Sequence, residues 1–175
     1  SDGYKAYETA IRDTQDISHV GCLAHVRRKF HEASKASKKA GGAHIGLAKI
    51  QKIYREDEAI RSAGLEPDDI VVERHKRVVP LLDDFKSWLD EKATRVRPTS
   101  SFGKALSYAG SEWRKVSRFV MSPYLTPDNN AAERAIRPFV VGRKNWLFSG
   151  SPQGANASCF FYSMIETAKA NELNP

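Results

Sequence analysis

The sequence has little cysteine. Only two cysteines occur among 175 residues, Cys22 and Cys159, and they lie far apart in apolar surroundings. Two isolated thiols provide neither a disulfide framework nor a C-x-x-C metal motif. We therefore expect buried, reduced thiols in a cytosolic protein.

Several functional signatures are also missing. No apolar run approaches the roughly 18–20 residues that a membrane span needs. There is no Gly-rich phosphate loop, no zinc signature and no nucleophile elbow. The five histidines do not form a metal-ligand cluster by their spacing. His75 falls on an apolar helical stripe, where a core position is the simpler interpretation.

What the sequence has in excess is positive charge. Lys and Arg total 28 against 21 Asp and Glu, which gives a net charge of +7 and a pI near 9.5. Such a balance favours polyanionic partners, of which nucleic acid is the commonest. A basic protein without a specific partner remains the alternative.

Helical patterns dominate the chain up to residue 121. A short helix is expected from Tyr4 to Arg12 and a buried strand over Ile17–Leu23. The other expected elements are helices, over Ala24–Lys39 (ended by Gly41-Gly42), Ile45–Ala63, Ile70–Val96 (kinked at Pro80) and from Phe102 to Val120.

Two more helices are expected in the last third. One begins within Asp128–Arg134 and ends near Gly142. The other covers Ala155–Asn171 and is expected to bury Phe160, Phe161, Met164, Ile165 and Ala168. A lone strand among so many helices cannot satisfy its own edges. Either the fold is nearly all-α or sheet partners lie outside the sequence.

Glu133 is the first candidate for chemistry. Asn130 lies three residues before it and Arg137 four after it, so the three share a helical face. A glutamate beside an amide and a guanidinium suits one corner of a magnesium site that handles phosphates. Alternatively, Asn130 is an N-cap and Glu133 closes a capping box. Spacing alone leaves both open.

The remaining candidates each have a structural alternative. Asp2 is either a turn residue or a carboxylate following an upstream strand. The basic run Arg27, Arg28 and Lys29 either tracks a phosphate backbone or is solvated charge. In Arg143-Lys144-Asn145-Trp146, the aromatic ring either stacks on an unpaired base or belongs to the core.

Two motifs carry a family resemblance. The stretch Asp128–Pro138, which contains Asn-Asn-x-x-Glu-Arg, and the stretch Gly142–Ser151, which contains Arg-Lys-Asn-Trp, together closely resemble transposases of the insertion sequence 66 family. Three further stretches agree: Asp2–Tyr4 with Tyr7, Cys22–Phe30 and Ile165–Asn171. The likeness runs end to end and is tightest after Thr126.

The resemblance implies a mainly α chain with one or few short strands, as part of a ribonuclease H-like catalytic core with a helical insertion. Residues 1–42 would form the second-acid side of the core, 43–121 the insertion, and 122–175 the Glu-bearing helix and final helix. Asp2 would be the second acid and Glu133 the third. The first would precede Ser1, so the chain is expected to be a fragment that is inactive alone.

The implied activity is that of a DDE transposase. It cleaves transposon ends and joins them to target DNA by two-metal phosphoryl transfer, with two Mg²⁺ or Mn²⁺ ions about 3.5–4 Å apart. The resemblance makes Asp2 and Glu133 metal ligands. Charge and position make Arg137, Arg143 and Lys144 candidates for DNA contact. We expect a homo-oligomer on DNA. The protein is expected in the bacterial cytoplasm, associated with the nucleoid, and without a membrane partner. A non-catalytic DNA-binding or assembly module is the alternative.

Overall fold

The chain is mainly helical and divides into two compact units. The computed structural model describes residue 9 and residues 17–36, 41–146 and 149–174, and of residues 143–146 it describes the backbone. Within these residues there is no β-strand. Unit 1 is Ser1–Asn129 and unit 2 is Asn130–Pro175. No described helix is both long enough and apolar enough to cross a membrane.

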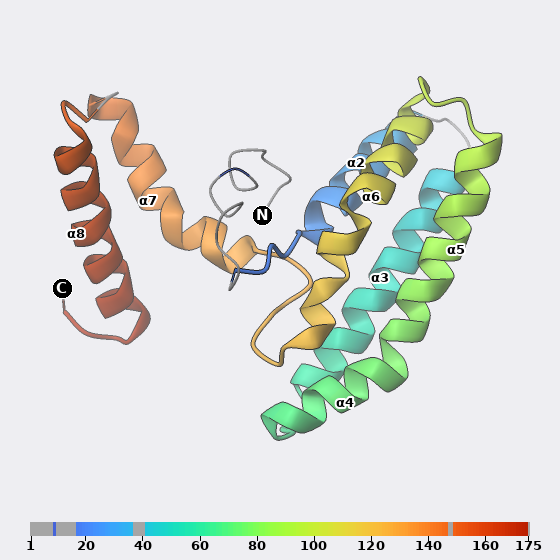
Figure 1. The fold of residues 1–175 in the computed structure, drawn as a ribbon, viewed down its shortest axis with the longest axis horizontal. Coiled ribbons are helices and arrows are strands. Elements are labelled where there is room, and N and C mark those ends of the chain that lie inside the picture. The colour runs from blue at the N-terminus through green and yellow to red at the C-terminus, as the bar shows by residue number, and fades with distance from the viewer. Residues whose placement is uncertain (1–8, 10–16, 37–40, 147–148, 175) are drawn as a thin grey trace. The chain divides into compact units, whose positions relative to one another are not determined.

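Unit 1 is a bundle of helices. Its described elements are α2 (Leu23–Lys35), α3 (Gly42–Arg61), α4 (Pro67–Arg77), α5 (Val79–Arg95), α6 (Ser101–Val116) and the short 3₁₀ helix η1 (Arg118–Met121). In Figure 1, α2, α3, α5 and α6 run side by side and α4 lies at one end. Helix α2 packs on α3 and α6, while α5 packs on α3, α4 and α6.

An aromatic cluster fills one end of the core of unit 1. The ring of Phe30 lies 6.0 Å from Phe85, 6.1 Å from Trp88 and 6.1 Å from Phe102 between centroids, in tilted or edge-on geometries. Helix α3 passes close to this cluster at Gly46. A Cβ atom at that position would stand 2.4 Å from the Phe30 ring, so only glycine allows the approach.

Local sequence signals explain where several helices begin and end. The Ser100 side chain accepts a hydrogen bond from the Gly103 amide (3.0 Å) and caps α6. Pro67 opens α4 and is followed by acidic residues in the first turn. Gly64, three residues after α3, has a φ of +68°, which glycine adopts without strain. The helix that was expected from Ile70 therefore begins earlier, at Pro67.

The predicted strand Ile17–Leu23 is wrong. Residues 17–22 have no regular secondary structure, and Leu23 already belongs to α2. The Gly21 amide donates to the Lys115 carbonyl (3.0 Å) and the Leu23 amide to the Pro127 carbonyl (2.8 Å). The segment is apolar because it packs against the end of α6 and a loop, and a short apolar run alone does not identify a strand.

The single helix expected over Ile70–Val96 is two helices that break at Val78. Pro80 lies in the first turn of α5, where its missing N–H leaves no hydrogen bond unmade. The break changes which face of α4 is inward. His75 is exposed, so its interpretation as a core residue is wrong, and Arg74 is buried instead.

Two helix boundaries near Gly41 and Gly42 also differ from expectation. Helix α2 ends at Lys35 instead of Lys39, and Gly42 begins α3 instead of ending α2. The expected helix Tyr4–Arg12 lies outside the described residues except for Thr9.

Unit 2 contains α7 (Asn130–Trp146) and α8 (Pro152–Ala170). The two pack together through Phe139 and Tyr162, whose rings are 5.2 Å apart and nearly perpendicular. Helix α7 contains Pro138 and continues past Gly142 to Trp146, so the end predicted at Gly142 is wrong. An internal glycine costs a helix only about 1 kcal/mol relative to alanine, so Gly142 does not by itself end α7.

The burial predicted for α8 is wrong. None of its residues is buried in this structure. The exposed side chains include four that were expected in the core, namely Phe160, Phe161, Met164 and Ile165, and Ala168 is half-buried. The expectation of buried thiols holds for Cys22 and fails for Cys159, which is exposed. One partner helix covers too little of α8 to enclose these side chains.

Candidate functional site

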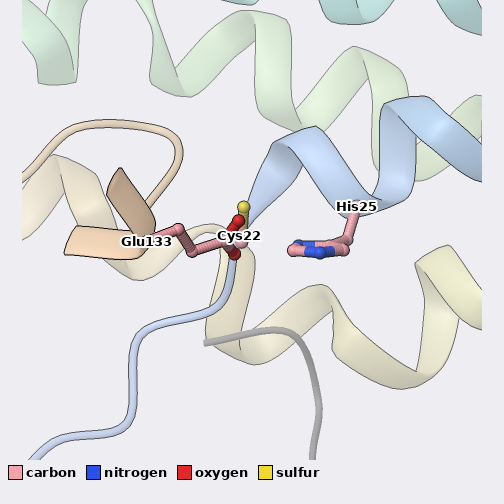
Figure 2. A group of neighbouring side chains, drawn as sticks. All are labelled: Cys22, His25 and Glu133. Atoms are coloured by element: carbon pink, nitrogen blue, oxygen red, sulfur yellow. The ribbon is translucent and has the colours of Figure 1, made fainter. Parts of the chain in front are cut away.

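Glu133 lies in the first turn of α7. Its side chain is exposed, and Figure 2 shows it projecting from that helix. Together with Asn130, Arg134 and Arg137 it lines an open depression along one face of α7. The expected sharing of a face by Asn130, Glu133 and Arg137 is therefore confirmed. The partial positive charge at a helix N-terminus also favours an acidic side chain at this position.

The chemistry of this face suits a metal ion and a phosphate. A carboxylate and an amide oxygen are hard ligands of the kind that Mg²⁺ takes. The guanidinium groups of Arg134 and Arg137 present planar donors that match phosphate oxygens. Glu133, Arg134 and Arg137 on this face are exposed. Sequence reasoning singled out Arg137, four residues after Glu133, and overlooked Arg134, which directly follows Glu133.

Residues 117–129, here called the connector, lead from α6 to the start of α7. Tyr54 on α3 forms a side-chain hydrogen bond with Asp128 near the connector's end. Burial, reinforced by the negative charge of Asp128, raises the pKa of Tyr54 above its usual value. The phenol therefore stays protonated and donates to the carboxylate.

The connector contacts a buried ion pair. Arg74 on α4 and Asp57 on α3 are both 0% exposed. Arg74 Nε donates to Asp57 Oδ1 at 2.8 Å, and Arg61 Nε donates to the other oxygen, Oδ2, also at 2.8 Å. The carboxylate is thus shared by two cations, which offsets the cost of burying its charge.

The other nitrogens of Arg74 hold the connector. Nη1 donates to the carbonyls of Phe119 (3.1 Å) and Ser122 (2.6 Å), and Nη2 donates to the carbonyl of Leu125 (2.8 Å). The guanidinium carbon also lies 5.5 Å from the centre of the Phe119 ring, a cation–π distance. One side chain therefore binds three backbone carbonyls of the connector, one in η1 and two in the irregular segment after it.

Helix α2 separates apolar from basic residues. Leu23, Val26 and Phe30 enter the core, while Arg27, Arg28 and Lys29 are exposed. Lys29 lies 3.6 Å from Glu32. In Figure 2, Cys22 and His25 lie at the start of this helix. The exposed cations match a surface for a phosphate backbone, but solvated charge has the same appearance, so DNA binding here stays a prediction.

Some candidates fall outside the described part of the chain. Asp2 is one of them, so its predicted approach to Glu133 stays a prediction. Arg143 and Lys144 lie in the last turns of α7, and their side chains are likewise outside the described part.

Sequence reasoning missed Arg74 and Tyr54. Arginine is seldom buried, and Arg74 was not considered among the candidates from the sequence. A usable signal was present: Ile70, Arg74 and Val78 follow one another at steps of four, the spacing of an inward face.

Comparisons with known proteins agree with the resemblance. The family model described as "Transposase IS66 family" matches residues 1–157. Among curated proteins, "Uncharacterized protein y4hP" of Sinorhizobium fredii (strain NBRC 101917 / NGR234) is 29% identical over 187 residues, covering 100% of this chain and 34% of its own length. "Uncharacterized protein y4jD" of the same strain is 28% identical over 179 residues, covering 99% and 34%. No solved structure matches. The chain thus spans about a third of the length of these relatives.

Proposed function

We propose, on the premise that this chain belongs to the transposase IS66 family, that the full-length protein is a DNA transposase. It would cleave the ends of a mobile element and join them to target DNA by two-metal phosphoryl transfer. The observation that carries the proposal is the exposed face of α7 that gathers Asn130, Glu133, Arg134 and Arg137.

Glu133 and Asp2 are proposed as two of the three acids that hold Mg²⁺ or Mn²⁺ in the intact enzyme. The exposed carboxylate of Glu133, with an amide one turn away, fits such a hard cation. When bound, two ions of this kind activate an attacking oxygen and stabilise the leaving one. In this assignment residues 122–175 belong to a ribonuclease H-like core and residues 43–121 to a helical insertion.

The chain's other polar residues would handle the DNA. Arg134 and Arg137 would orient the phosphate next to Glu133, because a guanidinium binds two phosphate oxygens in a fixed geometry. Arg27, Arg28 and Lys29 would contact the backbone elsewhere along the duplex, joined by Arg143 and Lys144. A homo-oligomer assembled on DNA in the bacterial cytoplasm, associated with the nucleoid, completes the proposal.

The 175-residue chain is expected not to cut DNA by itself. The family's site needs three acids, and the resemblance places only Asp2 and Glu133 in this sequence. Mg²⁺ demands near-octahedral geometry, so loss of a ligand lowers both occupancy and alignment. A misplacement of about 1 Å already costs on the order of 100-fold in rate.

Nicking of labelled element-end DNA in Mg²⁺ or Mn²⁺ tests the proposal. The full-length protein should cut, and Glu133→Gln should lower its rate by at least roughly 100-fold. Glu166→Gln on α8 is the matched control, because its partner is Lys169 on the same helix, and it should cut like the parent. Equal cutting by Glu133→Gln would remove Glu133 from the site. Cutting by the 175-residue chain that Glu133→Gln abolishes would show that two acids suffice.

A non-catalytic DNA-binding or assembly module is the second candidate, and the exposed cations of α2 favour it. On that alternative the full-length protein binds element ends, neither metal supports cutting, and Glu133→Gln changes nothing. The same assay therefore separates the two functions.

A further inference from the structure

We propose that Arg74, together with Tyr54, is a positioning residue for Glu133, acting through the connector. The inference rests on the proposed function of Glu133 and goes beyond it, because it gives the helical insertion a part in the reaction. Neither side chain belongs to the motifs that identify the family.

Past η1, the backbone of the connector is irregular apart from a turn in which the Leu125 amide donates to the Ser122 carbonyl (3.3 Å). Residues 122–129 include no helix or strand. Irregular backbone normally exchanges its hydrogen bonds with water and moves. Here the carbonyls of Phe119, Ser122 and Leu125 all accept from one buried guanidinium, so their position follows that of Arg74.

Arg74 is itself held by buried contacts within unit 1. It is fully buried and its Nε is paired with Asp57, which Arg61 holds from the other side. A planar fork with several fixed donors cannot be replaced by a single ammonium group. The connector is therefore fastened to α3 and α4 by a rigid group.

Further contacts fasten the connector up to its end. The Pro127 carbonyl accepts from the Leu23 amide at 2.8 Å, and Asp128 is bound by Tyr54. Helix α7 starts two residues after Asp128, and Glu133 lies in its first turn. The insertion thus holds the backbone up to the point from which the acid-bearing helix departs.

A metal ligand must be held to within a fraction of an ångström for full activity. Loosening the connector is therefore expected to displace Glu133 without changing any group in the site. This separates Arg74 from a residue that only stabilises the fold.

The test compares Arg74→Lys with Arg77→Lys in the full-length protein. Both residues lie on α4 and undergo the same chemical change, but Arg77 is on the surface and pairs with Glu56 on α3. Two quantities are measured: hydrogen exchange of the amides of residues 118–133, and the cleavage rate at saturating DNA as a function of Mn²⁺ concentration.

Arg74→Lys should speed exchange across the connector at least tenfold, lower the maximal cleavage rate at least tenfold and raise the Mn²⁺ midpoint, with DNA affinity unchanged. Arg77→Lys should do none of these. If Arg74→Lys exchanges faster yet cleaves normally, or cleaves slowly with unchanged exchange, the proposal is overturned.

A second variant covers the case in which Arg74→Lys does not fold. Tyr54→Phe keeps the ring and removes only the hydroxyl that binds Asp128, so it should raise exchange around Asp128 and raise the Mn²⁺ midpoint. An unaltered midpoint with a folded protein would also overturn the proposal. Absence of cleavage by the unmodified protein is a different result, since it refutes the proposed function itself, while the exchange data still report whether Arg74 fastens the connector.

Discussion

The core phenylalanines of unit 1 and the phenylalanines of α8 in unit 2 lie in opposite environments. Phe30 and Phe85 in unit 1 are 0% exposed, whereas Phe160 and Phe161 in unit 2 are each 61% exposed. Both units show apolar residues at helical spacing, so the sequence pattern does not distinguish them. The difference lies in the number of packed helices, because several enclose an interior and two do not. An apolar stripe therefore predicts that a partner surface is needed, not that the same unit supplies it.

The largest effect is expected from truncating one phenylalanine in each unit. Phe85→Ala removes a ring that packs against Phe30, Trp88 and Trp113 and should lower the free energy of unfolding by about 3–5 kcal/mol. Phe161→Ala removes a largely exposed ring and should change it by less than about 1 kcal/mol. Denaturant titrations followed by circular dichroism measure both. Similar losses in the two variants would mean that α8 is buried in solution.

A smaller effect is expected from carboxylates that are adjacent in sequence. Asp57→Asn breaks a fully buried pair with Arg74 and should cost about 3 kcal/mol. Glu56→Gln breaks the surface pair with Arg77 and should cost at most about 1 kcal/mol. Thermal melts of the two variants at one pH provide the comparison. Equal melting temperatures would show that the buried pair contributes no more than the surface one.

The smallest effect concerns charge on unit 1. Reversing Arg27 and Arg28 to Glu should remove two phosphate contacts. The slope of log DNA affinity against log salt concentration should then become less negative by roughly 0.9 for each lost contact. The control reverses Lys86 and Lys92, which already pair with Asp90 and Glu91. It makes the same change in net charge and should leave the slope closer to the parent's. If both pairs act alike, α2 is only a solvated face and has no specific DNA contact.

Much of unit 1 was predictable because its signals are local. Pro67, Ser100 and the apolar spacing of α5 and α6 determine helix starts and inward faces without information from elsewhere in the chain. The conformation of segment 17–22 was not predictable, since its apolar residues are equally compatible with a strand and with an irregular segment. Only its contact with α6 distinguishes these two possibilities. The exposure of α8 was also beyond reach, because spacing reports which face is apolar and not whether anything covers it.

The site follows the same division. The shared face of Asn130, Glu133 and Arg137 follows directly from helical geometry. The hydrogen bonds from Arg74 to the connector do not follow from the sequence. They join residues as far apart as Arg74 and Leu125 through backbone carbonyls, and every residue has a backbone carbonyl. The assignment of Asp2 stays a prediction drawn from family resemblance.

The half-buried phenol of Tyr54 also makes the stability of the fold depend on pH in the alkaline range. Its pKa is raised in the folded chain by burial and by Asp128, whereas in the unfolded chain it ionises near pH 10. Below that pH the phenol is neutral in both states, and its share of the folding free energy is fully present. As the pH rises further only the unfolded chain releases the proton, so stability falls. Tyr54→Phe, which has no proton to lose, should show a shallower decline of unfolding free energy above pH 10.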